Sequence, residues 1–138
     1  MILTKTISFK TQGRCDITNI TPQVDDIIAA AGIASGSVTI FITGSTAGVT
    51  TIEYEPGLVA DTKEIWQKLV PQGVSYHHDS RWGDGNGFSH LRASLQGASL
   101  TIPFSAKKLL LGTWQQIVVI DFDNRSRTRE VILQVMGE

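Results

Sequence analysis

The sequence has very little cysteine: Cys15 is the only one among its 138 residues. An intramolecular disulfide needs two cysteines, and structural zinc sites built on thiolates need at least two, so both are excluded as sources of stability. A chain of this length buries about two thirds of its unfolded surface and needs no such cross-link. We therefore expect a single domain over residues 1–138, stabilised by an apolar core.

An excess of charge of one sign is also absent. Lysine and arginine number 12 and aspartate and glutamate 13, which leaves a formal net charge of −1. This balance predicts neither a nucleic acid nor an anionic membrane surface as a partner. No run of residues approaches the roughly 18 apolar residues of a membrane span, and residues 1–10 alternate apolar with polar side chains, unlike a signal peptide. We expect a cytoplasmic protein.

Short β-branched segments separated by polar turns dominate what is present. They predict strands at residues 3–9, 38–43, 49–54, 99–103, 115–122 and 130–136. Two helices are predicted: the first follows Thr21 and ends at Gly32, and the second begins near Asp61 and ends before Pro71. The polar stretch 123–127 is typical of a hairpin loop. This pattern indicates an α+β domain with a largely antiparallel sheet and two short helices.

All three histidines lie in the polar, glycine-rich stretch 77–92. His77 and His78 are adjacent, so in an extended segment they point to opposite faces and only one can join a common site. His90 lies far enough beyond His78 for the intervening glycine-rich turn to bring the two together. Imidazoles ligate divalent metals or transfer protons near neutral pH, and the oxygens of Asp84 and Asn86 suit a hard cation.

A tight surface turn is the alternative interpretation of this stretch. The histidine spacing matches no zinc motif such as His-Glu-x-x-His. The segment from Asp84 to Ser89 is similar to the start of a calcium-binding loop, but Leu95 occupies the twelfth position, where an acidic ligand is required. Calcium is therefore excluded.

Two further polar segments are candidates for binding. Ser45 and Thr46 lie between glycines and offer hydroxyl and backbone N–H groups to an anion, although the lysine of a P-loop is missing. Glu53 and Glu55 alternate along a predicted strand and would share one face, as a carboxylate pair that holds a metal or titrates unevenly. Solvated charges at a sheet edge are the alternative for this pair.

The segment after His90 contains Arg92 and Ser94 at a spacing of two. In a strand all three side chains would share a face, and the arginine could bind a phosphate with two hydrogen bonds. A last candidate segment follows Gly112 and consists of Thr113, Trp114 and Gln115. Its tryptophan either anchors the sheet beside a turn or stacks on a flat substrate ring.

These segments together resemble the YjbQ-type family, also called the secondary thiamine-phosphate synthase family. The resemblance covers nearly the whole chain. It rests on Ser-Thr-Ala-Gly-Val-Thr (45–50) followed by Glu53 and Glu55, on Gly83-Asp-Gly-Asn86, on Ser89-His-Leu-Arg-Ala-Ser94, on Leu111-Gly-Thr-Trp-Gln115 and on Gly137-Glu138.

The resemblance implies a compact α+β fold that assembles as a homotrimer, with polar pockets near subunit boundaries. It also implies a weak transferase activity that joins a pyrimidine methyl diphosphate to a thiazole phosphate and releases pyrophosphate. The implied cofactor is a divalent metal ion, Mg²⁺ or Zn²⁺. The implied residues are His78, Asp84 and His90 for metal or proton chemistry, with the two histidines as metal ligands, Ser45, Thr46, Arg92 and Ser94 for phosphate, and Glu53, Glu55, Asn86, Thr113, Trp114 and Gln115 for the pocket wall.

One position departs from the family pattern. Many members begin the first block with His-Thr-Ser or His-Thr-Thr, whereas this chain has Gly44-Ser45-Thr46 and so lacks one potential imidazole ligand. A metal would have two histidines here, completed by Asp, Glu or water. Two alternatives to a synthase therefore stay open: a trimer that binds a metal or a phosphorylated ligand without turnover, and a structural module whose polar stretch seals a subunit interface.

Overall fold

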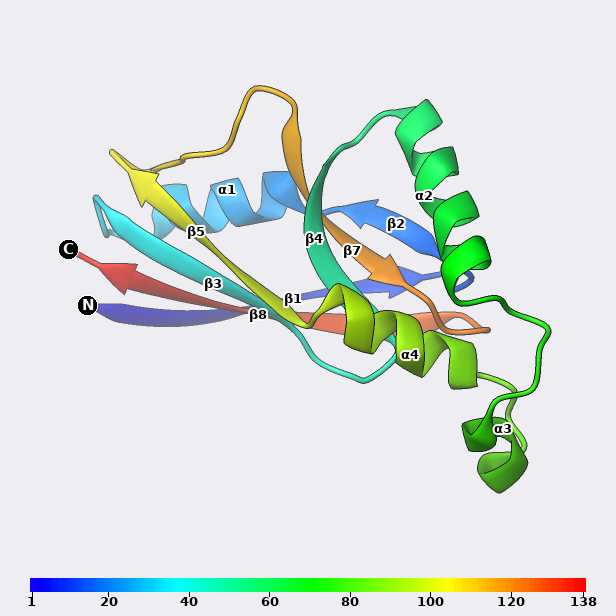
Figure 1. Ribbon diagram of the computed structural model, residues 1–138. Helices are drawn as coiled ribbons and strands as arrows, with labels where there is room; N and C mark the ends of the chain where they lie inside the picture. The colour runs from blue at the N-terminus through cyan, green and yellow to red at the C-terminus, as the bar shows by residue number, and fades with distance from the viewer.

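Eight strands and four helices follow one another in the computed structural model, which describes residues 1–138 (Figure 1). The strands are β1 (Ile2–Thr11), β2 (Asp16–Asn19), β3 (Gly36–Ile42), β4 (Ala47–Glu53), β5 (Ser99–Ser105), β6 (Lys108–Leu109), β7 (Gln115–Asp121) and β8 (Arg127–Gly137). The helices are α1 (Thr21–Ala30), α2 (Pro56–Leu69), α3 (His77–Trp82) and α4 (Gly87–Gln96).

The strands form two antiparallel sheets. The larger sheet has the order β1-β8-β3-β5-β6, and the smaller has the order β2-β7-β4. Strands β1 and β8 pair along their length, from Ile2 opposite Met136 to Thr11 opposite Arg127. The two ends of the chain therefore lie side by side, at the left of Figure 1. This architecture confirms the predicted α+β class with antiparallel pairing.

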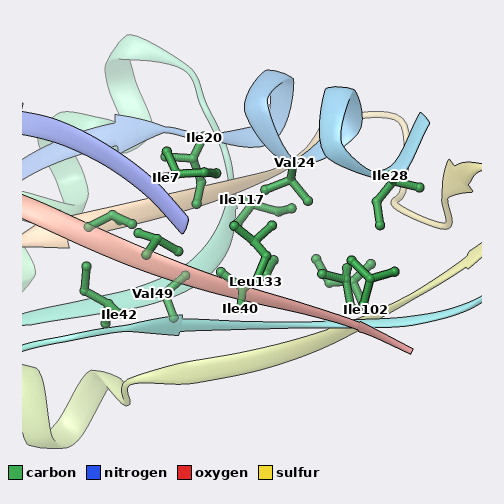
Figure 2. Close-up of a cluster of buried hydrophobic side chains, with 14 of the residues drawn as sticks. Ile7, Ile20, Val24, Ile28, Ile40, Ile42, Val49, Ile102, Ile117 and Leu133 are labelled. Carbon is green, nitrogen blue, oxygen red and sulfur yellow. The ribbon is translucent and has the colours of Figure 1, made fainter. Parts of the chain in front are cut away.

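The main core lies between the two sheets and helix α1 (Figure 2). Val24 and Ile28, one turn apart on α1, are fully buried and belong to this core together with Ile40 of β3 and Leu133 of β8. Spacing of three or four residues places apolar side chains on one face of a helix, which explains why α1 was recognisable from its sequence. The 17 buried side chains of this cluster form the larger of two apolar clusters in the domain.

Strand β7 is covered on both faces. Ile117 and Val119 belong to the main core, whereas Val118 and Ile120 belong to a second cluster that also contains Trp66 of α2 and Phe88 of α4. Successive residues of a strand point to opposite faces, so a strand enclosed on both sides is a continuous apolar run. The second cluster fixes α2 and α4 against the smaller sheet, and α4 contains the last part of the histidine stretch.

The prediction of two helices was incomplete, because the structure has four. The first predicted helix is confirmed as α1, and the second is α2, which begins at Pro56 instead of near Asp61. The carboxylate of Glu55 accepts hydrogen bonds from the backbone N–H groups of Gly57 (2.6 Å) and Leu58 (2.8 Å), which caps the helix at this earlier point. Glu55 therefore belongs to a helix start, and the expectation that it shares a strand face with Glu53 was wrong.

The histidine stretch forms the two additional helices, α3 and α4. The turn between them begins at Gly83, whose φ of 73° ends α3 in the left-handed region that glycine adopts most easily. The buried residues of α4 include Phe88 and Arg92, one helical turn apart. The predicted strand after His90, with a spacing of two, was therefore wrong, because these residues form a helix.

No helix in the structure has both the length and the apolar character required to cross a lipid bilayer.

Candidate functional site

Helices α3 and α4 bring His78 and His90 together. The centroids of the two imidazole rings are 4.3 Å apart, and the rings are tilted by 38° to each other. His77 is exposed, as expected if only one of the adjacent histidines joins a shared cluster. The sequence-based expectation that the glycine-rich turn returns His90 to His78 is therefore met by the geometry.

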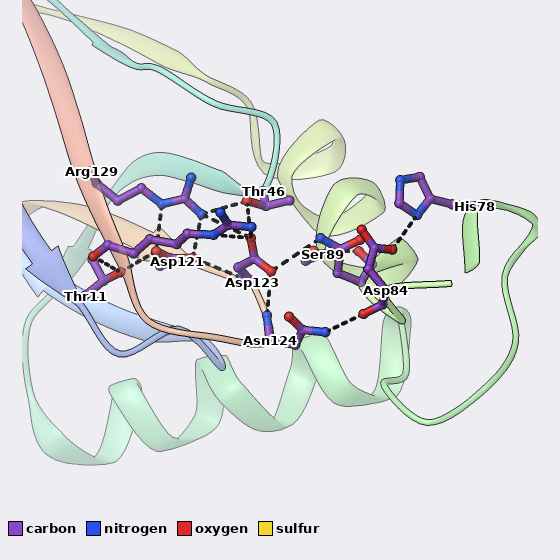
Figure 3. Close-up of polar contacts among 11 residues, drawn as sticks. Thr11, Thr46, His78, Asp84, Ser89, Asp121, Asp123, Asn124 and Arg129 are labelled. Carbon is purple, nitrogen blue, oxygen red and sulfur yellow. Dashed lines mark hydrogen bonds and ion pairs between the residues drawn. The ribbon is translucent and has the colours of Figure 1, made fainter. Parts of the chain in front are cut away.

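Two carboxylates lie close to the Nδ1 atom of His78. The Oδ1 atom of Asp84 is 3.7 Å away and that of Asp79 is 3.9 Å away, as the dashed line to Asp84 indicates in Figure 3. The donor atoms of these three residues lie within 4.8 Å of one another. The Nδ1 atom of His78 is buried and has no hydrogen-bond partner. A buried imidazole nitrogen without a partner, beside two carboxylates, is the arrangement expected where a cation binds.

Asp79 was not a candidate from the sequence, and its side chain also has a structural role. Its Oδ2 accepts a hydrogen bond from the backbone of Tyr76 (3.1 Å), and its Oδ1 accepts one from the backbone of Gly87 (2.8 Å). These two bonds join the start of α3 to the start of α4. A carboxylate has about four acceptor positions, so Asp79 retains capacity for another partner.

Asn86 lies between two carboxylates. In one orientation of its amide, the nitrogen donates to Asp123 at 3.4 Å; in the other, it donates to Asp84 at 3.0 and 3.2 Å. The side chain is buried and cannot donate to both. A cation beside Asp84 would resolve this conflict, because the amide oxygen could then coordinate the ion while the nitrogen stays on Asp123.

The turn between β7 and β8 contacts the loop that carries Asp84 (Figure 3). Asn124 donates from its Nδ2 atom to the backbone carbonyl of Asp84 at 2.9 Å. The buried carboxylate of Asp123 forms an ion pair of 2.7 Å with Arg127 and accepts a hydrogen bond of 3.0 Å from Thr46. Burial alone would raise the pKa of Asp123, but the hydrogen bonds from Asn124, Thr46, Arg127 and Asn86 outweigh it and lower that pKa.

The surroundings of His90 lower the pKa of its imidazole and so favour the neutral form. Its burial lowers its pKa from the ordinary value of 6.5, and the nearby His78 lowers it further. The carboxylates of Asp123 and Asp84 oppose this shift without reversing it. A neutral imidazole has a free lone pair, which a metal ligand or a proton acceptor requires.

The predicted phosphate-binding residues are divided between two environments. Ser45 and Ser94 line a shared hollow of about 250 Å³, together with Gly44. Thr46, in contrast, is buried, and its hydroxyl donates to Asp123 and accepts from Arg129 (2.7 Å). The hydroxyl of Thr46 is thus occupied by partners inside the protein.

Arg92 does not share a face with His90. Residues two apart on a helix are separated by about 200° around its axis, and Arg92 is only 3% exposed. Its guanidinium donates to the carbonyl of Val70 (2.9 Å) and to the side chain of Gln67 (3.1 Å), and it stacks on the ring of Phe88. The predicted strand face was therefore wrong, and Arg92 ties α4 to the end of α2.

Of the predicted pocket wall, Asn86 lies in the histidine cluster, whereas the other residues lie elsewhere in the fold. Glu53, Glu55, Thr113 and Trp114 line a second pocket of about 530 Å³, together with Asn19, Tyr54, Pro56 and Gln116. This pocket is at the start of α2, whereas the histidine cluster follows its far end (Figure 1). Gln115 instead accepts a hydrogen bond from the backbone N–H of Gly112 and donates one to the hydroxyl of Thr51 on β4. The candidate residues therefore do not form one continuous site in the fold.

Residues that sequence reasoning missed are concentrated at the end of β7 and in the turn that leads to β8. The polar stretch 123–127 was predicted as a hairpin loop. It does form a turn, but the hairpin was wrong, because β7 and β8 belong to different sheets and do not pair. The burial of Asp121 and Asp123 was not anticipated. Asp121 forms a pair with Arg129 through two contacts of 2.7 Å, and it also accepts a hydrogen bond from Thr11. The available signal was the alternation of aspartate with an apolar residue at the end of the long apolar run. Aspartates at this spacing continue the buried positions of the strand, where a carboxylate needs a partner.

The fold and the cluster together define a small α+β protein with two antiparallel sheets and a histidine–carboxylate cluster between two short helices. The family described as "UPF0047 protein YjbQ-like" matches residues 5–138. A UPF0047 protein of Archaeoglobus fulgidus is 38% identical over 94% of this chain and 98% of its own length, and UPF0047 protein YugU of Bacillus subtilis is 33% identical over 96% and 98%. The chain belongs to the YjbQ-like UPF0047 family.

Solved structures of similar proteins agree with this assignment. A crystal structure of a YbjQ-like protein of unknown function from Sulfolobus solfataricus P2 has a TM-score of 0.90, with 28% identity and complete coverage of both chains. An uncharacterised member of the same family from Clostridium acetobutylicum has a TM-score of 0.87 and 32% identity, covering 96% of this chain and 99% of that one. The two sheets and the helices described here are therefore the fold of this family.

Proposed function

We propose that the chain binds a divalent metal ion, Zn²⁺ or Mg²⁺, between α3 and α4, and uses it to bind a small phosphorylated molecule. The observation that carries this proposal is the buried Nδ1 atom of His78, which has no hydrogen-bond partner and faces the carboxylates of Asp84 and Asp79. His90 and Asn86 are the further candidate ligands.

The spacing of the donor atoms supports a shared ion. Donors bonded to one small divalent ion at about 2.1 Å are separated from each other by about 3 to 3.6 Å. The distances from His78 to Asp84 (3.7 Å) and to Asp79 (3.9 Å) need only small side-chain adjustments to reach this range. Asp84 is half exposed and is held through its backbone, so its carboxylate is free to adjust.

Imidazole nitrogens favour Zn²⁺, whereas Mg²⁺ prefers the oxygens of carboxylates, amides and phosphates. The cluster offers both kinds of donor. With two histidines, the cluster leaves coordination positions for water or for an oxygen of the ligand, which suits a site that binds phosphate through its metal.

The candidate reaction, carried by the family resemblance, is that of a weak thiamine-phosphate synthase. A nitrogen of the thiazole phosphate forms a bond to the methylene carbon of the pyrimidine while the bond from that carbon to the diphosphate oxygen breaks, and pyrophosphate leaves with the electron pair. A bound divalent ion would stabilise the negative charge that develops on the leaving diphosphate. Neutral His90 would accept or hold a proton beside the ligand.

Assembly as a homotrimer is part of the proposal. Two pairs of apolar residues, each separated by one helical turn, are exposed: Ile65 with Leu69 on α2, and Leu91 with Leu95 on α4. Exposed apolar stripes on helices are typical of protein interfaces. The mass in solution, measured by light scattering, should be three times the 15.0 kDa of one chain.

The experiment compares thiamine phosphate formation by the wild type, Asp84→Ala and His90→Ala in the presence of Mg²⁺. His77→Ala is the matched control, because this histidine is exposed and next to His78. The synthase proposal expects losses in the two cluster variants and none in the control; equal rates in all four proteins contradict it. Metal uptake that depends on Asp84 and His90, without any thiamine phosphate formed, would identify a binding protein instead.

A further inference from the structure

A further polar hollow, distinct from the two pockets described above, lies beside the candidate metal site, between the turn after β1 and the turn after β7. It has a volume of about 550 Å³ and is lined only by polar residues, namely Gln12, Arg14, Asn124, Arg125 and Ser126. Neither arginine was a candidate from the sequence. Asn124 belongs to both places, because its side chain also donates to the backbone carbonyl of Asp84.

Close contact between the two turns builds this hollow. Gly13, Arg14 and Cys15 have successive φ values of 73°, 57° and 64°, all in the left-handed region. The backbone N–H of Arg14 donates to the carbonyl of Asp123 at 2.6 Å, and a Cβ atom on Gly13 would lie 2.3 Å from the carbonyl oxygen of Arg125. Left-handed backbone at residues other than glycine is costly and persists only where the surroundings fix it. The opposing turn therefore fixes the position of Arg14.

The two arginines of the hollow are exposed. Neither Arg14 nor Arg125 forms an ion pair with a carboxylate. The buried Asp123 is already paired with Arg127, and Asp16, the other nearby carboxylate, accepts the backbone N–H of Gln12. An adjoining hollow of about 470 Å³ shares two of the lining residues and adds Lys10 and Arg127. In a chain of net charge −1, this is a local concentration of cations.

Exposed guanidinium groups that line the same hollow and form no ion pair can bind phosphate oxygens with paired hydrogen bonds. We propose that the hollow between the two turns binds the phosphate or diphosphate group of a small molecule through Arg14 and Arg125. The ligand class rests on the proposed function, and the shared Asn124 places such a group next to the metal site. The positive side chains expected for a phosphate thus come from these turns in place of the buried Arg92.

The test measures binding of inorganic pyrophosphate by calorimetry at low salt and in the presence of a chelator that removes divalent metals. The variant Arg14→Gln/Arg125→Gln should bind pyrophosphate about tenfold more weakly than the wild type, because two charge-assisted contacts are lost. The control Lys107→Gln/Lys108→Gln removes the same charge from the exposed end of β5 and β6 and should bind as the wild type does. Equal affinity of the wild type and the arginine variant, or no binding by the wild type, would overturn the proposal.

Two further measurements separate this proposal from the metal site and from a misfolded turn. His78→Ala should keep its pyrophosphate affinity in metal-free buffer, whereas the arginine variant should keep its affinity for Zn²⁺. Arg125→Gln alone leaves the left-handed segment at Gly13 to Cys15 unchanged and should already weaken pyrophosphate binding. A short single-stranded oligonucleotide that binds the hollow and is not displaced by pyrophosphate would contradict the small-molecule class.

Discussion

The imidazole rings of His78 and His90 lie 4.3 Å apart, although the two residues are twelve positions apart in the sequence. The turn between α3 and α4 brings them together and carries Asp84 in the same loop. No hydrogen bond links the two rings, and burial with the neighbouring ring lowers the pKa of His90. Two imidazoles that approach so closely avoid mutual repulsion when at least one is neutral, which is the state that a metal ligand requires.

Asn124→Ala should weaken metal binding without removing a ligand. The side chain of Asn124 donates to the backbone carbonyl of Asp84 at 2.9 Å and so positions the loop that carries this carboxylate. Loss of such supporting contacts lowers metal affinity by roughly tenfold or more. Competition with a fluorescent zinc chelator measures the change. Asn19→Ala, whose amide donates to Gln116 beside the other pocket, is the control, and equal affinities in both variants would contradict the supporting role.

Arg129→Met should strongly destabilise the fold. Arg129 makes two contacts of 2.7 Å with the fully buried Asp121, and its removal leaves a buried carboxylate whose charge is uncompensated. Breaking such a pair typically costs about 3 to 5 kcal/mol, and urea denaturation measures the loss. Arg125→Met, in the exposed part of the turn between β7 and β8, should stay within about 0.5 kcal/mol of the wild type. A loss below about 1 kcal/mol for Arg129→Met would show that the pair is not a stabilising contact.

The carboxylate of Glu55 makes the start of α2 sensitive to acid. Hydrogen bonds from the backbone of Gly57 and then of Leu58 lower its pKa below the ordinary value of 4.5. In this range the unfolded chain binds the proton more readily than the folded chain does. The stabilisation by the cap is therefore complete above about pH 4.5 and is lost as the pH falls through the lowered pKa.

Glu55→Gln tests this pH dependence in thermal melts. The difference in melting temperature between the wild type and the variant should be present near neutral pH and should shrink as the pH falls below the ordinary glutamate value. Glu53→Gln is the matched control, because this carboxylate caps no helix. A constant difference between the wild type and Glu55→Gln at every pH would contradict a charged cap.

The strands and the first helix could be predicted because their burial patterns are regular. Strand β7 is a continuous apolar run since both of its faces are covered, and α1 has apolar residues one turn apart. The helices of the histidine stretch were missed because glycines at 83, 85 and 87 favour a turn. Gly83 and Gly85 do lie in a turn, but it joins two short helices, and Gly87 is the first residue of α4. Glu55 was assigned to a strand because it alternates with Glu53, although its side chain caps a helix.

The site was predicted only in part. The contact between His78 and His90 could be predicted, because the sequence shows that the segment between them is long enough and rich enough in glycine to fold back. The separation of Trp114 from this cluster depends on how β4 and α2 cross the domain, which no local pattern specifies. Arg14 and Arg125 converge only because two distant turns pack together, so neither appeared significant in the sequence.

Metal binding by the histidine cluster is the central claim, and calorimetric titration of chelator-treated protein with Zn²⁺ tests it most directly. The wild type and His77→Ala should bind one equivalent per chain with the same affinity. His78→Ala and Asp84→Asn should bind at least tenfold more weakly, because each lacks a direct ligand. Zinc binding of equal strength by all four proteins, or no zinc binding by the wild type, would contradict the assignment of this cluster as a metal site.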